Sequence, residues 1–243
     1  MTVHTLNLSI IVPLLNEANN LPQLIGHISR LRPVPQQVIL VDGGSNDGSV
    51  SIARELLKDV SSRTHSLTDW FVIESIAGRA RQMNAGAGQA TGEVLLFLHA
   101  DTQLPTDAID KVEIAMRQHK WGRFDVRLNS TLPLLKVVGT MINKRSRLVS
   151  VATGDQAIFV KRSVFEQFGG YADQPLMEDI ELCKRLKNIS RPACLKSKVT
   201  TSARRWQQHG NVRTVFLMWR LRFDYWRGVS PDVLKQRYYK QHR

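Results

Sequence analysis

The chain has 243 residues, of which 42% are hydrophobic, and a formal net charge of +13 at neutral pH. This apolar content supports a buried core and excludes general disorder, and no apolar run approaches the roughly 20 residues that a membrane-spanning helix needs. Two cysteines and an N-terminus without a recognisable signal peptide lead us to expect a cytoplasmic protein with reduced thiols.

The first half of the chain alternates between apolar runs and amphipathic segments. Four apolar runs predict buried strands, at residues 8–12, 38–41, 70–73 and 94–98. Four segments with capping residues or helical spacing predict helices, at about residues 18–31, 49–58, 79–90 and 105–119. This alternation predicts an α/β fold with a mostly parallel sheet flanked by helices and a ligand site at the carboxyl ends of the strands.

The second half follows a less regular pattern. Strands are expected at residues 124–128 and 157–160, and helices at 132–149, 178–187 and 212–226. No repeat, low-complexity segment or linker interrupts the chain. We therefore expect one continuous domain over residues 1–206, followed by a helical extension over residues 207–243.

Positive charge is concentrated in the last quarter of the chain. Residues 184–243 hold 16 of the 34 Lys and Arg residues but only two of the 21 Asp and Glu residues, and aromatic residues are interleaved with the basic ones. Such a segment is typical of binding to an anionic surface, which is either phospholipid or nucleic acid. No nucleic-acid motif accompanies it, so a membrane is the favoured partner. The alternative is a solvated basic face over an ordinary aromatic core.

Polar side chains follow the first two predicted strands. Asn16 and Glu17 come after the first strand, and Asp42 ends the second. Side-chain oxygens at strand ends can accept hydrogen bonds from a ribose hydroxyl or a base N–H. Taken alone, the turn after Asp42 is explained equally well by strand–turn–helix chemistry.

A third polar group lies at the start of the helix predicted at 79–90. Arg79, Arg81 and Asn84 follow Gly78, at a helix N-terminus where free N–H groups and the helix dipole favour a phosphate.

His99 and Asp101 follow the fourth predicted strand at alternate positions, so both side chains point to the same side of an extended segment. They could share a divalent ion with diphosphate oxygens, either Mg²⁺ or Mn²⁺. A core histidine is an equally good interpretation of His99, and a helix cap is a weaker one of Asp101.

Glu178 and Asp179 begin a predicted helix. One could act as a general base with the other orienting it, or both could simply complement the helix dipole.

Several motifs, in chain order, resemble those of family 2 glycosyltransferases of the GT-A fold. They are Pro13-Leu14-Leu15-Asn16-Glu17, Asp42-Gly43-Gly44-Ser45-Asn46-Asp47-Gly48, Asn84-x-Gly86 with Ala90-x-Gly92, the Asp-x-Asp position ending at Asp101, and Glu178-Asp179. Segments 78–84, 97–102, 153–159 and 202–206 are similar to a bacterial subgroup labelled transferase-2 or selenodomain-associated glycosyltransferases. The resemblance covers about residues 8–206.

The resemblance implies a nucleotide-binding half over residues 1–120 and an acceptor half over residues 121–206. It implies a nucleotide-sugar donor, most often a UDP-sugar, that is bound by Pro13, Asn16, Glu17, Asp42, Gly43, Gly78, Arg79, Arg81, Asn84 and Asp101. Gly154, Asp155 and Gln156 would lie near the sugar or acceptor, and Arg205 and Trp206 near the acceptor or diphosphate. Asp101, with His99, would hold Mn²⁺ or Mg²⁺ on the diphosphate. Asp179, beside Glu178, would be the base of an inverting transfer to an acceptor hydroxyl.

Two residues depart from the family pattern. His99 replaces the first Asp of Asp-x-Asp, which puts the metal in question, and Ser202 replaces the Gln of Gln-x-x-Arg-Trp, which argues against a processive polymerase. Together with the basic tail, the resemblance leads us to expect a lipid acceptor and a peripheral position on the cytoplasmic membrane face.

Two other functions stay open. A sugar-nucleotide nucleotidyltransferase is disfavoured because such enzymes carry a glycine-rich basic loop where residues 13–17 stand. A non-enzymatic anion- or membrane-binding protein would use the basic extension alone.

Overall fold

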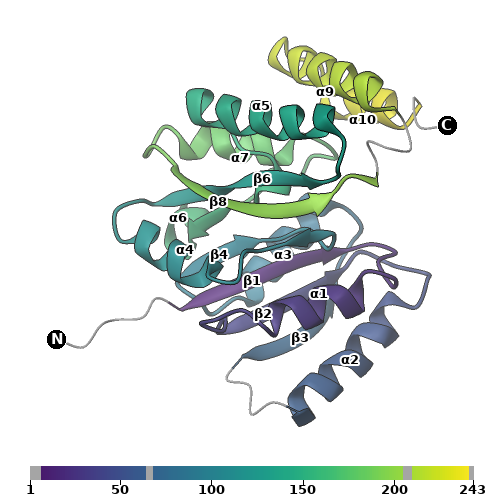
Figure 1. Cartoon of the computed structure of the whole chain (residues 1–243), viewed down its shortest axis with the longest axis vertical. Coiled ribbons are helices and arrows are strands. Elements are labelled where there is room, and N and C mark those ends of the chain that lie inside the picture. The colour runs from purple at the N-terminus through teal and green to yellow at the C-terminus, as the bar shows by residue number, and fades with distance from the viewer. Residues whose placement is uncertain (1–6, 64–67, 205–209, 241–243) are drawn as a thin grey trace.

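The computed structural model describes residues 7–63, 68–204 and 210–240 (Figure 1). Within these residues eight strands form one sheet in the order β3-β2-β1-β4-β7-β6-β8-β5. The strands are β1 Leu8–Leu14, β2 Gln37–Asp42, β3 Asp69–Glu74, β4 Val94–Phe97, β5 Thr102–Gln103, β6 Trp121–Asn129, β7 Phe159–Lys161 and β8 Ala193–Ser202.

The first four of these strands lie where the sequence predicts them, and all the contacts among them are parallel. β1 pairs with β2 on one side and with β4 on the other, and β2 pairs with β3. Leu14 stands opposite Asp42, and Ile11 stands opposite Phe97. The carboxyl ends of β1, β2 and β4 therefore meet at one edge of the sheet, as expected for this fold class.

The second half of the sheet is mixed. β7 is antiparallel to both β4 and β6, β5 is antiparallel to β8, and β6 and β8 are parallel to each other. Sequence analysis did not predict β5 or β8. β5 has only two residues, and β8 carries polar, partly exposed side chains along most of its length, so neither forms an apolar run.

Helices cover both faces of the sheet. They are α1 Leu21–Ile28, α2 Ser49–Arg63, α3 Arg79–Gln89, α4 Ala108–Met116, α5 Pro133–Val149, α6 Arg162–Gln167, α7 Glu178–Leu186, α9 Asn211–Trp226 and α10 Pro231–Lys240, with the 3₁₀ helix η1 at Gly154–Gln156. α6 was not predicted, and α10 falls within the helical extension expected over residues 207–243, where no separate bounds were given for it. In the part of the chain that the structure describes, no helix is both long and apolar enough to cross a bilayer.

Side chains on successive strand residues enter two separate cores. Ile10 and Val12 pack with α1, α2 and α4, whereas Ile11 packs with α3, α6 and α7. Both cysteines are free thiols. Cys183 of α7 is buried in the second core, where burial raises the pKa of its thiol to about 12, while Cys194 of β8 is partly exposed.

The C-terminal helices pack against α7. Leu217 and Leu221 of α9 contact Ile180 of α7 and Leu234 of α10 in a third core. Asp224 of α9 accepts a hydrogen bond of 2.5 Å from Arg237 of α10. The aromatic side chains of α9 are not part of this core. Phe216, Trp219, Phe223 and Trp226 are all exposed.

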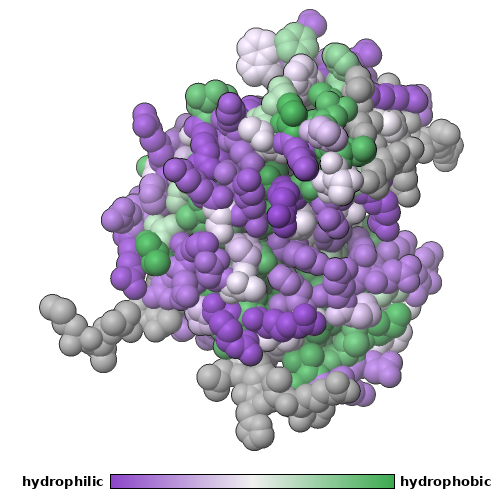
Figure 2. Space-filling model, viewed as in Figure 1, coloured by the Kyte–Doolittle hydropathy of each residue, from purple (hydrophilic) through white to green (hydrophobic). Residues whose placement is uncertain are grey.

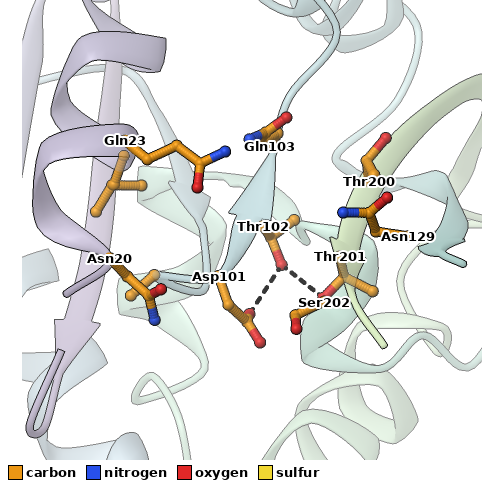
Figure 3. Close-up of a pocket in the computed structure, with 11 residues that line it drawn as sticks. Asn20, Gln23, Asp101, Thr102, Gln103, Asn129, Thr200, Thr201 and Ser202 are labelled. Atoms are coloured by element: carbon orange, nitrogen blue, oxygen red, sulfur yellow. Dashed lines mark hydrogen bonds between the residues drawn. The ribbon is translucent and has the colours of Figure 1, made fainter. Parts of the chain in front are cut away.

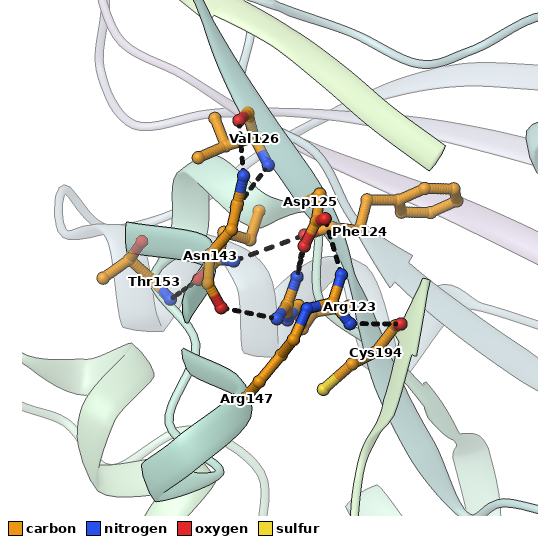
Figure 4. A network of polar contacts seen from close by, with 9 residues as sticks. Arg123, Phe124, Asp125, Val126, Asn143, Arg147, Thr153 and Cys194 are labelled. Carbon is orange, nitrogen blue, oxygen red and sulfur yellow. Dashed lines mark hydrogen bonds and ion pairs between the residues drawn. The ribbon is translucent and has the colours of Figure 1, made fainter. Parts of the chain in front are cut away.

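A buried network of charges ties α5 to the sheet (Figure 4). Arg123 of β6 is fully buried, pairs with Asp125 and donates to the Asn143 carbonyl at 3.2 Å. Arg147 of α5 donates to the second carboxylate oxygen of Asp125 at 2.5 Å. The amide of Asn143 exchanges two hydrogen bonds, of 2.8 and 2.9 Å, with the backbone of Val126. This network sets the height and rotation of α5 over β6.

Replacing Asp125 with Asn should therefore destabilise the protein strongly, because Arg123 would stay buried without its counter-charge. We expect the free energy of unfolding to fall by about 3–5 kcal/mol. Glu74→Gln is the matched control, since it breaks the Arg54–Glu74 pair, whose side chains are 59% and 67% exposed, and should cost at most about 1 kcal/mol. Urea denaturation checks both values, and equal losses would contradict the role given to the network.

Candidate functional site

The loops after β1 and β2 are bonded to each other. The backbone N–H of Asn16 donates to Ser45 Oγ at 2.8 Å, and Asn16 Oδ1 accepts from the Asn46 N–H at 3.0 Å. The N–H of Glu17 donates to Ser49 Oγ at 2.9 Å. Asn16 adopts a left-handed conformation with φ of 56°, which this residue type tolerates in turns. These contacts bring Asn16 and Glu17 to the end of β2.

Asp42 is buried at the end of β2, and its carboxylate is half satisfied. One oxygen, Oδ2, accepts from the N–H groups of Gly44 at 2.8 Å and Ser45 at 2.9 Å. The other, Oδ1, is buried and has no hydrogen-bond partner among the described residues. Because buried acceptors in native proteins are nearly always paired, this oxygen fits a donor supplied by a ligand.

The side chain of Gln82 holds the two strand ends together from α3. Its amide nitrogen donates to the carbonyls of Leu14 at 2.6 Å and Val41 at 2.9 Å. A Cβ added at Gly43 would lie 2.8 Å from the Gln82 side-chain carbon, so only glycine fits beside it. Pro13 lies within β1, opposite Val41, and completes this strand end.

Asp101 lies in a small polar cavity of about 130 Å³ between the start of α1 and the end of β8. Figure 3 shows its carboxylate between Asn20 and Ser202, with a 3.4 Å hydrogen bond from the Thr102 hydroxyl. Burial raises the pKa of Glu17, and the negative charge of nearby Asp101 adds to that rise. Glu17 and Asp101 are thus two carboxylates close enough to repel each other, as two acidic side chains around a cation would be.

The residues present fit a metal held jointly by protein and substrate, not a cage made by the protein alone. The described residues contain no group of three His, Cys, Asp or Glu side chains able to hold a metal. His99 Nδ1 lies 3.2 Å from Asp155 Oδ1. Its Nε2 faces Gly154, where an added Cβ would lie 2.3 Å away. One carboxylate, here Asp101, together with phosphate oxygens and water is an ordinary Mg²⁺ or Mn²⁺ site.

Asp179 and η1 form the second part of the site. Asp179 is partly exposed, and its Oδ2 accepts from the Gly154 N–H at 2.8 Å. Its Oδ1 accepts from the Ile180 N–H at 2.7 Å. These two backbone donors fix the orientation of the carboxylate, while an ionised carboxylate retains further lone pairs for a substrate proton.

Glu178 and Arg79 connect the N-termini of α7 and α3. They form an ion pair of 3.4 Å in which Glu178 is buried and Arg79 is partly exposed. Gly78, with φ of 136°, places Arg79 at the first position of α3. Burial raises the pKa of Glu178; Arg79 opposes that rise and the charge of Asp179 adds to it.

Other residues of the predicted site have partners of their own. Arg81 pairs with exposed Asp173, and both polar atoms of the Asn84 amide bond the backbone of Tyr171. Gln156 is fully buried and donates to the Phe124 carbonyl at 3.3 Å. Arg205 and Trp206 lie outside the described residues. For these five residues, contact with a donor stays a prediction.

Two arginines near Asp179 were not singled out from the sequence. Arg145 of α5 and Arg222 of α9 line a pocket that also includes Asp155. Arg222 lies outside the i, i+7 stripe of Arg213, Arg220 and Arg227, all of which are exposed. Departure from that stripe is the one sequence signal that could have distinguished Arg222.

Comparisons with known proteins point to one enzyme family. The family model described as glycosyl transferase family 2 matches residues 9–127. A PGL/p-HBAD biosynthesis glycosyltransferase of Mycobacterium bovis is 32% identical over 169 residues, which is 67% of this chain and 62% of that protein. An undecaprenyl-phosphate 4-deoxy-4-formamido-L-arabinose transferase of Pectobacterium atrosepticum is 32% identical over 109 residues, 44% of this chain and 32% of that protein. The chain thus spans less than two thirds of either relative.

Two solved structures share the architecture. The mannosyltransferase PcManGT from Pyrobaculum calidifontis, in complex with GDP-Man and Mn²⁺, has a TM-score of 0.60 at 19% identity, covering 82% of this chain and 57% of its own. S. aureus TarS 1–349 in complex with UDP has a TM-score of 0.60 at 16% identity, covering 81% and 60%. At such identities the likeness shows the fold.

The raised pKa of Glu178 predicts a pH-dependent effect of Glu178→Gln. Below pH 4.5 Glu178 is protonated in the folded and unfolded states alike, so the substitution changes little through charge. As the pH rises through the higher folded-state pKa, ionisation destabilises the wild type but not the variant. The free energy of unfolding of Glu178→Gln, relative to wild type, should increase from pH 4 to pH 8.

Urea denaturation at several pH values measures this difference. Glu166→Gln, at an exposed glutamate of α6, is the control and should show a flat profile. A relative stability of Glu178→Gln that falls with rising pH would show that the pair with Arg79 outweighs burial.

Proposed function

Because this chain belongs to glycosyl transferase family 2 and has the GT-A fold, we propose that it transfers a sugar from a nucleoside diphosphate sugar to an acceptor hydroxyl with inversion. One observation carries the proposal. A half-satisfied buried carboxylate stands at the end of β2, and an oriented, partly exposed carboxylate at the start of α7 accepts from Gly154, which lies against His99 directly after β4.

The donor nucleotide is assigned to the ends of β1 and β2. Asp42 Oδ1 accepts from the base or ribose, and Asn16 and Glu17 lie in the adjoining loop. Arg79, at the start of α3, adds a positive charge for the diphosphate. UDP is the donor nucleotide we propose from the family resemblance. TarS binds UDP, whereas PcManGT binds GDP-Man, so both belong in the test.

Asp179 supplies the proton acceptor. The acceptor oxygen forms its new bond to the anomeric carbon as the bond from that carbon to the diphosphate oxygen breaks, and the hydroxyl proton passes to Asp179. The hydrogen bonds from Gly154 and Ile180 hold this carboxylate in place. A single displacement of this kind turns an α-linked donor into a β-linked product.

Asp101 would hold the divalent ion of the proposal, Mn²⁺ or Mg²⁺, together with the donor diphosphate. When bound, the ion neutralises charge on the leaving group. Glu17 lies nearby on the same side. His99, bonded to Asp155, positions η1 in the present arrangement, and ligation by His99 stays a prediction.

Asp179→Asn should abolish transfer while leaving donor binding intact, because the amide keeps its size but cannot accept the proton. We expect kcat to fall by about 10²–10⁴-fold. Release of nucleoside diphosphate is followed with UDP- and GDP-sugars, Mn²⁺, Mg²⁺ or chelator, and bacterial membrane lipid extract as the source of acceptors.

Asp110→Asn, an exposed aspartate of α4, is the control and should retain full activity. Equal rates for Asp179→Asn and wild type would exclude Asp179 as the base. Release of pyrophosphate in place of nucleoside diphosphate would instead indicate a nucleotidyltransferase.

A lipid acceptor at an anionic, cytoplasmic membrane face is the second part of the proposal. The names of two relatives, one in PGL/p-HBAD biosynthesis and one acting on undecaprenyl phosphate, support it. So does the surface, because exposed apolar and aromatic side chains gather on α5 and α9 among basic residues. Figure 2 shows hydrophobic side chains at the top of the molecule, where Figure 1 places α9. Such a surface suits a membrane interface.

Phe223→Ser combined with Trp226→Ser should weaken membrane binding, because these side chains of α9 are 55% and 75% exposed and belong to none of the buried cores. Flotation with vesicles of equal parts phosphatidylglycerol and phosphatidylcholine should show at least about tenfold less bound protein than for wild type. The control, Ile76→Ser with Ile114→Ser, removes two exposed apolar residues elsewhere and should float like wild type. Unchanged flotation of the α9 variant would contradict this surface.

A further inference from the structure

A pocket of about 310 Å³ lies between α5, α9 and η1, apart from the strand ends assigned to the nucleotide. α5 and α9 contact each other, and both lie at the same end of the molecule in Figure 1. Apolar side chains from both helices, including Ile142 and Met218, form most of the lining. Met141 and Trp219 also line the pocket and are about half exposed, so its opening is apolar as well.

Two guanidinium groups in this pocket have donors that no described residue pairs with. Nε and Nη2 of Arg145 and Nε of Arg222 are buried and have no hydrogen-bond partner among the described residues. Arginine stays charged in proteins and carries five donors, so each unpaired, buried donor destabilises the fold unless something accepts from it. Burial, and the charge of Arg222, lower the pKa of Arg145 to about 10, which leaves Arg145 positive at neutral pH; burial also lowers the pKa of Arg222.

The pocket extends to the proposed reaction centre. Asp155 lines it and contacts His99 directly after β4. The preceding residue, Gly154, donates to Asp179. The negative charge of Asp179 opposes the lowering of the pKa of both Arg145 and Arg222, so both guanidinium groups lie within electrostatic reach of the proposed base.

We propose that this pocket binds the acceptor, and that the acceptor is a single-chain anionic amphiphile that also carries the hydroxyl group to be glycosylated. Its chain lies on the apolar side chains of α5 and α9, and its phosphate or carboxylate group accepts from Arg145 and Arg222. This assignment rests on the proposed function. The acceptor then carries a negative charge that the donor-binding residues do not contact. The two arginines are thus determinants of acceptor specificity.

Binding of decyl phosphate to the full chain tests the inference without any donor. By isothermal titration calorimetry, below the critical micelle concentration, decyl phosphate and decanoate should bind at least about tenfold more tightly than decanol, and inorganic phosphate should bind least. Arg222→Gln and Arg145→Gln should each weaken decyl phosphate binding at least about tenfold, without changing decanol binding.

Arg220→Gln is the matched control on α9, because its side chain is 72% exposed and does not line the pocket. Decanol binding as tightly as decyl phosphate in the wild type would overturn the inference, even where a variant failed to fold. So would arginine variants that bind like wild type. If either binding result were obtained while release of nucleoside diphosphate still depended on Asp179, only the acceptor assignment would fail and the proposed function would stand. The two failures are therefore distinguishable.

Discussion

Parallel pairing of β1 with β2 and β4 is the constraint on which the proposed site depends. This pairing sets Leu14 opposite Asp42 and brings three strand ends to one edge. Gln82 donates to the Leu14 and Val41 carbonyls near the ends of two of these strands, so the edge is held by side-chain as well as ladder hydrogen bonds. A shift of one residue in this register would turn Asp42 to the other face of the sheet. The loop bonds of Asn16 would be lost with it.

In the second half of the molecule, different interactions position the elements that contribute to the site at this edge. Here the strands are mixed in direction, and buried charges rather than parallel crossovers hold α5 in place. Since α5 contributes one wall of the pocket proposed for the acceptor, the pair of Arg123 and Asp125 would support acceptor binding from a distance. The two ion pairs thus have different structural roles. Arg79 with Glu178 connects the two halves of the molecule, and Arg123 with Asp125 holds elements of the second half together.

The amino-acid sequence predicts the first half of the fold well because buried parallel strands are continuous apolar runs with caps between them. β1, β2, β3 and β4 all lie where such runs predict them. Residues that pair over long sequence distances leave no comparable local signal. In the sequence, Arg123 cannot be distinguished from an ordinary exposed arginine on a strand, because its burial depends on Asp125 and α5. The polar sequence of β8 is similarly typical of a loop. The same limit applies to Arg222, whose burial depends on how α9 packs on α7.

The contrast between the two thiols has a practical consequence. Only the thiolate is nucleophilic, so Cys183, buried and with a pKa of about 12, is inert at neutral pH, whereas Cys194 is partly open to solvent. Cys194 is the second residue of β8, and its carbonyl accepts from Arg147 of α5 at 3.0 Å. The natural chain therefore offers one chemically addressable point for a maleimide dye or nitroxide label, close to the helix that walls the pocket.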